Sequence, residues 1–366
     1  MKFKISISLI AILCLTNNNF VWGQMEYIGL KEEANVREAQ NQLITVFGTY
    51  WPESQLIDNY LYIPTVSGIY RKNLSFVNDT IWELHAFEGV PIRDFIKNND
   101  TILAATAIFA DTNLLLLSTN DGLSYIDYTP TSFFNINSEI TILKTAQNPH
   151  NPNNLAVMHT GLGVYLSSDF GQNWTLSNHF IGGYQDWFLG FNPNDTSNIF
   201  YTGEQLFFQS YIFTTYNNGN NWTKVDSLQS HCTHGVAFHP TNKDIMISYG
   251  EGRFSKSINQ GQNWSDVGSI PLYIYKVIFD PENPNILYAS GDFHGVNDTI
   301  TVYRSTDMGD NWQVFYQEKI TNSDGVMGIH LFNGKLFVYT LTNGVFLLDI
   351  DNITSINEAL STKELL

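Results

Sequence analysis

The chain has 366 residues and a formal net charge of −17 at pH 7. This charge argues against a nucleic acid and against an anionic membrane surface as partners. Aromatic residues make up 14% of the chain, and together with its many Asn and Gly residues they favour strands joined by turns over helices.

The first 23 residues predict a signal peptide. Lys2 and Lys4 supply a short basic region, and the apolar run 5–15 has the length of a signal core but is too short to span a bilayer. We expect cleavage after Gly23 and an exported mature chain, in the periplasm, on the cell surface or in the medium, without a membrane span. An uncleaved anchor is the alternative.

Cysteine usage gives a second indication of the compartment. If the signal is removed, Cys232 is the one cysteine left, so the mature chain can form no internal disulfide. Small exported eukaryotic domains commonly rely on disulfides. The sequence therefore favours a bacterial surface or medium over a eukaryotic secretory pathway.

A turn motif, Ser/Thr-x-Asp/Asn-x-Gly-x-x-Trp, recurs along the chain. Its four complete copies are Ser167, Asp169, Gly171 and Trp174; Thr215, Asn217, Gly219 and Trp222; Ser257, Asn259, Gly261 and Trp264; and Ser305, Asp307, Gly309 and Trp312. A weaker copy is Ser118, Asn120, Gly122 and Tyr125. The five Ser/Thr positions, in chain order, are 49, 48, 42 and 48 residues apart. A period of this length indicates one repeated supersecondary unit.

A second motif follows the same period. It ends the first strand of a unit and consists of Asn148-Pro149, Asn192-Pro193, His239-Pro240 and Asp280-Pro281. In one unit the predicted strands, here called A to D, are 187–191, 199–202, 211–215 and 222–225. Four short strands at this period predict a blade of a β-propeller.

The chemistry of the turn motif is structural. An Asp or Asn in a tight turn accepts hydrogen bonds from the backbone N–H groups that follow it. The Gly adopts a conformation closed to residues with a Cβ, and the Trp can pack between neighbouring sheets. We therefore expect Asp169 and Asp307 to form turns rather than to act in catalysis or to bind calcium.

The repeat predicts an all-β fold with a single β-propeller over 24–351. Predicted C strands near residues 69, 123, 164, 212, 254, 303 and 345 give seven four-stranded blades, with six or eight as alternatives. Residues 24–39 are either a lead-in or the strand that closes the ring. Residues 352–366 are predicted to be a linker or tail.

The motifs resemble those of the Asp-box (BNR) propeller family. The stretches GVYLSSDFGQNW, TVYRSTDMGDNW and DPENPNILYASGD are most similar to its sortilin and xyloglucanase branch. The end of the chain, SINEALSTKELL, resembles the linker before the sorting domain of type IX secretion cargo in Bacteroidota. These resemblances imply an exported bacterial propeller, but the family contains both enzymes and non-enzymes.

The catalytic residues that this resemblance implies are poorly matched. Sialidases of the family hold a carboxylate with three arginines, whereas this chain has five arginines in all, three of them on or beside predicted C strands. Xyloglucanase-type enzymes place a catalytic Asp where Thr65 stands here, and a threonine is a poor general base. We expect a non-catalytic protein, with a glycoside hydrolase or lyase as the alternative.

Propeller geometry indicates where a ligand would bind. The two repeated turn types lie on one face, so the D–A and B–C connections, which do not repeat, share the opposite face around the channel. The candidate ligand-binding residues there are Asp186, Trp187, His231, His234, Tyr273, Glu251, Asp292 and Asp324. Aromatic rings with carboxylates suit a polysaccharide or a cell-surface protein as partner. A scaffold role in an envelope complex is a third hypothesis.

We expect neither a cofactor nor a metal. His231, Cys232 and His234 are metal-ligand types, but neighbouring residues of a strand point to opposite faces, so at most two of the three converge. Ordinary polar packing is the favoured interpretation of this stretch. We also expect a monomer.

Overall fold

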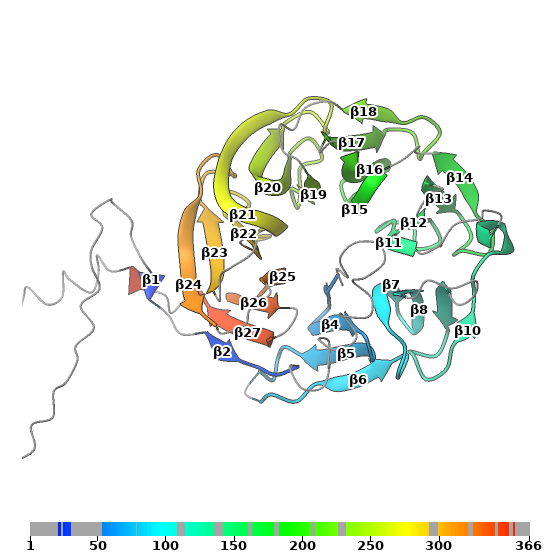
Figure 1. The fold of residues 1–366 in the computed structure, drawn as a ribbon, viewed down its shortest axis with the longest axis horizontal. Coiled ribbons are helices and arrows are strands. Elements are labelled where there is room, and N and C mark those ends of the chain that lie inside the picture. Colours follow the sequence, from blue (N-terminus) through cyan, green and yellow to red (C-terminus); the bar gives the residue numbers. More distant parts are fainter. Residues whose placement is uncertain are drawn as a thin grey trace, which may run out of the picture.

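The computed structural model describes residues 21–22, 25–30, 53–77, 79–107, 114–134, 142–159, 163–178, 183–205, 209–225, 232–292, 299–320, 325–340, 343–350 and 354–355. In these residues the chain is all-β apart from one 3₁₀ turn, η1 (Thr131–Phe134). The sheets form a ring (Figure 1), whose centre is here called the channel, and this arrangement confirms the predicted β-propeller. No helix in the described part of the chain is long and apolar enough to cross a bilayer.

Four sheets of the ring follow one another in sequence order, each with four antiparallel strands. The first contains β3 (Gln55–Ile57), β4 (Tyr60–Thr65), β5 (Gly68–Asn73) and β6 (Glu83–Ala86). The second contains β7 (Ile92–Asn98), β8 (Thr101–Thr106), β9 (Leu115–Ser118) and β10 (Ile126–Asp127). The third contains β11 (Ile142–Gln147), β12 (Leu155–His159), β13 (Gly163–Ser167) and β14 (Thr175–Asn178). The fourth contains β15 (Gly183–Asn192), β16 (Asp195–Gln205), β17 (Gln209–Thr215) and β18 (Thr223–Val225).

Two further sheets complete the ring. One is six-stranded and contains β19 (Thr233–Phe238), β20 (Met246–Ser257), β21 (Ser265–Phe279), β22 (Leu287–Asp292), β23 (Thr299–Ser305) and β24 (Gln313–Lys319). The other has the order β2-β27-β26-β25 and contains β25 (Val326–Phe332), β26 (Lys335–Thr340), β27 (Gly344–Asp349) and β2 (Glu26–Tyr27).

The predicted number of seven four-stranded blades is wrong. The described residues form six blades, five with four strands and one with six. The reason lies in β20 and β21, which each run through two of the strands that the repeat predicts. One end of β21 pairs with β20 and its other end pairs with β22, so hydrogen bonds join two Asp-box units in a single sheet.

The ring is closed by the N-terminal segment. β2 pairs with β27, so a strand from the start of the chain completes the sheet formed by its end. Ile28 and Leu30 are fully buried just after β2, and the Trp82 indole N–H donates to the Ile28 carbonyl at 2.8 Å. Residues 24–39 are predicted to be either a lead-in or the strand that closes the ring. Their described part forms the closing strand.

A short strand pair lies outside the ring, where β1 (Val21–Trp22) pairs with β28 (Thr354–Ser355). The predicted signal peptide (1–23) and tail (352–366) otherwise fall almost entirely outside the described residues. Their boundaries remain predictions.

The Asp-box turns share one hydrogen-bond pattern. In the turn that follows β13, the Ser167 hydroxyl donates to Asp169 Oδ1 at 2.8 Å and accepts from the Gly171 N–H at 2.8 Å. Asp169 Oδ1 also accepts from the Asn173 N–H at 2.8 Å. The residue before the Gly is left-handed in each complete copy, with φ between 55° and 59°. The turn therefore satisfies its own polar groups, and the Asp side chain acts in it as a hydrogen-bond acceptor.

The tryptophans of the motif pack within and between sheets. Trp312 stacks on Phe254 with ring centroids 4.2 Å apart, and Trp264 meets Phe200 edge-on at 6.5 Å. The apolar clusters that contain these tryptophans consist of residues from strands that are neighbours along the ring. The rigid ring fixes the innermost strands, whose first residues surround one mouth of the channel.

Candidate ligand-binding site

The innermost strands share a β-bulge near their first residues. The pairing register shifts at this point in β7, β11, β15, β19, the second half of β21, and β25. The extra residues at these shifts are Arg93, Leu143, Trp187, His234, Tyr275 and Met327. A bulge bends the strand and re-aims its side chains, and bulges are common beside functional sites. Here they surround one mouth of the central channel.

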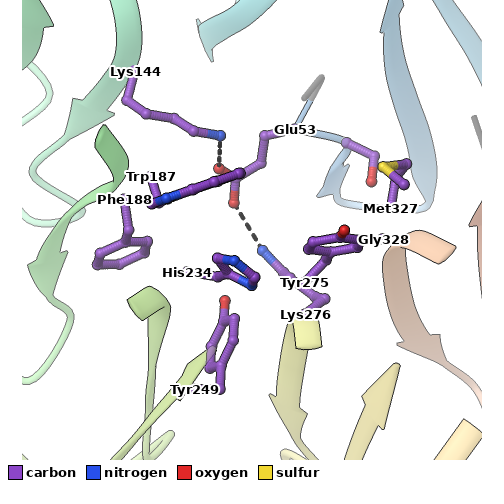
Figure 2. A pocket seen from close by; sticks show the side chains of 11 residues that line it. Glu53, Lys144, Trp187, Phe188, His234, Tyr249, Tyr275, Lys276, Met327 and Gly328 are labelled. Atoms are coloured by element: carbon purple, nitrogen blue, oxygen red, sulfur yellow. Dashed lines mark hydrogen bonds and ion pairs between the residues drawn. The ribbon is translucent and has the colours of Figure 1, made fainter. Parts of the chain in front are cut away.

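A pocket lies at this mouth (Figure 2). It comprises about 520 Å³ of space, part of it open to solvent, and it is lined by Glu53, Ser54, Lys144, Trp187, Phe188, His234, Tyr249, Tyr275, Lys276, Met327 and Gly328. The pocket is polar on the side of the Glu53 carboxylate and aromatic around His234.

The polar side is an ion triad that joins three sheets. Glu53, just before β3, accepts hydrogen bonds from the ammonium groups of Lys144 at 2.9 Å and Lys276 at 2.8 Å. Burial raises the pKa of Glu53, but the two ammonium groups outweigh it and hold that pKa far below its ordinary value. Burial lowers the pKa of Lys276, but Glu53 outweighs it and the net pKa is raised. Glu53 and Lys276 therefore stay charged at every ordinary pH.

A second carboxylate lies behind the triad. Asp94, on β7, accepts from the Phe95 N–H at 2.9 Å and from the Thr145 N–H at 2.7 Å and hydroxyl at 3.1 Å. Its side chain is buried, and burial raises its pKa to about 6 against the opposing effect of the Lys144 charge. Because both oxygens are engaged with neighbouring backbone and with Thr145 on β11, Asp94 ties two sheets together.

The aromatic side of the pocket is organised around His234. Its ring centroid lies 4.6 Å from that of Trp187 and 5.1 Å from that of Tyr275. His234 Nδ1 lies 2.7 Å from the Ile274 carbonyl oxygen, which can only accept, so Nδ1 carries the proton. Burial lowers the pKa of His234 to about 4, although the Ile274 carbonyl opposes this. The ring is thus neutral at pH 7, and its Nε2 is a hydrogen-bond acceptor.

Several predicted site residues lie together in the structure. Trp187 and His234 line the pocket, and Tyr273 stacks beside His234 at 6.5 Å. In the sheet, Tyr273 pairs with Glu251 on one side and with Asp292 on the other. Burial raises the pKa of Tyr273, and the Glu251 carboxylate adds to this effect.

The other predicted site residues are less fully described. Asp186 pairs with Gly203 through the backbone of β15, immediately before Trp187. His231 and Asp324 lie outside the described residues, and for Asp186 and Asp292 only the backbone is described. Within the described residues no group of three His, Cys, Asp or Glu side chains is placed to hold a metal, and Cys232 is a buried free thiol.

Sequence reasoning missed the charged residues of the pocket. Lys144 and Lys276 each lie four residues before the turn motifs that begin at Asn148 and Asp280. Phe188 and Gly235 take the same place before Asn192 and His239. Aligning the repeated units on this motif would have shown that two of them carry a lysine at the same position of the inner strand. Nothing comparable marks Glu53, because its unit lacks the motif.

No family model matches this sequence, and no curated protein matches it significantly. Solved structures do match in fold. YCF48 bound to a D1 peptide has a TM-score of 0.57 at 16% identity, over 81% of this chain and 91% of that chain. The GH74 xyloglucanase of Xanthomonas campestris has a TM-score of 0.58 at 14% identity, over 80% of this chain but only 50% of the enzyme.

A computationally designed protein, Ika8, matches comparably, with a TM-score of 0.54 at 14% identity over 82% of this chain and 83% of the designed one. At these identities the similarity concerns the fold and not the activity. The chain is therefore a β-propeller with a distant structural similarity to YCF48 and to the GH74 xyloglucanase.

Proposed function

We propose that this protein is an exported, non-catalytic propeller that binds a glycan or a protein ligand at the mouth of its central channel. The observation that carries the proposal is the pocket itself. Five aromatic rings, counting His234, and three charged groups converge there from several sheets. Concave sites with many aromatic residues and a few fixed polar groups are typical of ligand binding.

The state of the carboxylates supports binding over catalysis. A glycoside hydrolase that inverts its substrate needs two available carboxyl groups, one of them protonated at the start of the reaction. Glu53 is held in its charged form by two ammonium groups. Asp94 has a raised pKa, but its side chain is buried and both of its oxygens accept hydrogen bonds. Neither group is suited to act as a general acid on a ligand in the pocket.

The comparisons support the same proposal at the level of the fold. YCF48 was solved with a peptide bound, so a propeller of this shape serves as a binding module in that protein. The xyloglucanase is twice as long as the part that this chain matches. Export is supported by the predicted signal peptide.

The test is a binding screen of the mature chain on arrays of glycans and peptides, followed by mass spectrometry of every ligand that binds. Wild type is compared with Trp187→Ala, which removes an aromatic wall, and with Tyr125→Ala, which removes an exposed aromatic residue elsewhere on the protein. We expect intact ligands to bind wild type and Tyr125→Ala but not Trp187→Ala. Shortened products would instead make the protein a hydrolase or lyase. Binding that is indifferent to Trp187 would refute the location.

A further inference from the structure

One ring position sets the character of the pocket. This position lies just after the bulge of each inner strand and four residues before the turn that follows. It is occupied, in chain order, by Asp94, Lys144, Phe188, Gly235, Lys276 and Gly328. Glu53 holds the corresponding position just before β3. The two glycines are required by close neighbours. A Cβ at Gly235 would collide with the Tyr249 hydroxyl, and a Cβ at Gly328 would collide with the Ser54 hydroxyl. Around the ring, Asp94 and Lys144 follow Glu53, whereas Lys276 stands between the two glycines and reaches Glu53 from the other side.

The charges of the triad and of the carboxylate behind it balance one another. At pH 7 the ammonium groups of Lys144 and Lys276 are paired with Glu53, and the Asp94 carboxylate, buried behind this triad, brings the net charge of the four groups to zero. A ligand with a net charge would find no surplus of opposite charge in the pocket, and desolvating that charge would be costly. The balance therefore favours an uncharged ligand.

The pocket nevertheless offers both donors and acceptors of hydrogen bonds. An ammonium group has three N–H donors, and within the described residues those of Lys144 and Lys276 each make one hydrogen bond, to Glu53. His234 Nε2 is an acceptor, because Nδ1 carries the proton. A hydroxyl group satisfies both needs, since it donates one hydrogen bond and accepts others.

The remaining walls are aromatic, and an ion bridge lies across the channel. Trp187 and Tyr275 flank His234 (Figure 2). The Glu53 bridge joins the sheets of β11 and β21, so an extended ligand that ran along the channel would have to displace it. The space suits one ring-sized group at the end of a ligand rather than an extended segment.

We propose that the pocket binds the terminal residue of a neutral saccharide, with the sugar ring against Trp187 and Tyr275 and its hydroxyls on His234 Nε2 and the two lysines. This proposal rests on the proposed function and names the ligand class for the same site. It makes His234 and the lysines the residues that select a hydroxyl-rich, uncharged group.

The experiment is a calorimetric titration of the mature chain with neutral methyl glycosides of hexoses and pentoses, with glucuronic and galacturonic acids, and with a pool of short peptides. Binding of at least one neutral glycoside, at millimolar strength for a single sugar, is expected. His234→Leu should weaken that binding about tenfold, whereas His234→Gln, which restores an acceptor, should recover part of it. Tyr125→Ala should bind as wild type does. Thermal unfolding of each variant establishes that it is folded.

The outcomes separate this inference from the proposed function. Tighter binding of the uronic acids, or binding of peptides alone, would overturn the neutral saccharide and leave a binding site at the channel mouth. If His234→Leu fails to fold, Trp187→Leu, which removes the aromatic ring, takes its place, and unchanged glycoside binding by that variant would also overturn the inference. A chain that binds none of the three ligand classes would overturn both.

Discussion

The two faces of the ring differ in what recurs from one repeated unit to the next. At the Asp-box face the same residue types recur, and Ser167, Asp169 and Gly171 make the same bonds as Ser305, Asp307 and Gly309. At the channel mouth the same backbone feature, the bulge, recurs, but its side chains differ in every sheet. Repetition of residues thus marks the framework, and repetition of geometry with varied residues marks the candidate site.

This contrast has an energetic side. An Asp-box turn satisfies its polar groups within the seven residues 167–173, so each copy is an independent local unit. The triad of Glu53, Lys144 and Lys276 joins residues far apart in sequence. Loss of one partner at the mouth should therefore cost more than loss of one hydroxyl at the Asp-box face.

The largest effect is expected for Glu53→Gln. The variant leaves two partly buried ammonium groups without their ion-pair partner, with only the Asp94 carboxylate nearby to offset them. It should lower the free energy of unfolding by about 2–3 kcal/mol, less than a fully buried pair because 31% of the Glu53 side chain is exposed. Urea unfolding measures the change. Asp266→Asn, which breaks the exposed ion pair with Arg253, is the control and should cost no more than about 1 kcal/mol. Equal losses would refute a special role for the triad.

A smaller effect is expected at an Asp-box turn. Ser167→Ala removes the hydroxyl that accepts from the Gly171 N–H, and it should cost about 1–2 kcal/mol because that buried N–H loses its partner. Ser168→Ala makes the same chemical change one residue further on, at an exposed side chain, and should be neutral. Parallel thermal melts decide the matter, and a neutral Ser167→Ala would contradict the assigned turn bond.

The next effect concerns pH. His234 has a pKa of about 4 in the folded state, below its ordinary 6.5, so the unfolded chain binds the extra proton between these values. Its contribution to stability is complete above pH 6.5 and is lost as the pH falls towards 4. His330, with a pKa lowered to about 3, acts in the same direction. The raised pKa of Asp94 acts in the opposite direction, because its contribution is complete below 3.8 and is lost as the pH rises through about 6.

His234→Gln removes the contribution of that histidine. Its loss of stability between pH 7 and pH 5 should be smaller than that of wild type by on the order of 1 kcal/mol. Urea midpoints at pH 7, 6 and 5 provide the measurement. Parallel pH curves for the two proteins would show that His234 is not held neutral by the fold.

The smallest effect is expected for Asn217→Asp. The motif uses either residue, and Asn217 Oδ1 accepts from the Asn221 N–H at 2.9 Å as Asp169 Oδ1 does from Asn173. The change in unfolding free energy should stay within about 0.5 kcal/mol. A larger loss, seen by thermal unfolding at two salt concentrations, would mean that the turns are not interchangeable.

The repeated turns made the fold predictable, because a motif such as Thr215-x-Asn217-x-Gly219 determines a turn by local bonds alone. The number of blades was not predictable in this way. β21 is one continuous strand from Ser265 to Phe279 because it pairs with β20 at one end and with β22 at the other. The period of the motif carries no information about this pairing.

The candidate site was predictable in part. Trp187 and His234 stand in non-repeating stretches before strands, and this was enough to identify them. Glu53 lies in a unit without the turn motif, and its partners are 91 and 223 residues away along the chain. Only the closure of the ring brings these three charges together, so no local pattern could have predicted the triad.

The most direct test of a binding site at the channel mouth uses the methionine methyl groups as reporters. The mature chain, labelled with ¹³C at methionine methyls, is titrated with a neutral methyl glycoside, and Met327→Leu assigns the signal of Met327. Met327 lines the pocket, whereas Met158 is buried within its sheet and Met308 lies in an Asp-box turn. The account predicts that the Met327 signal shifts while those of Met158 and Met308 do not. A shift at Met308 with Met327 unmoved would place the ligand on the opposite face and contradict the account.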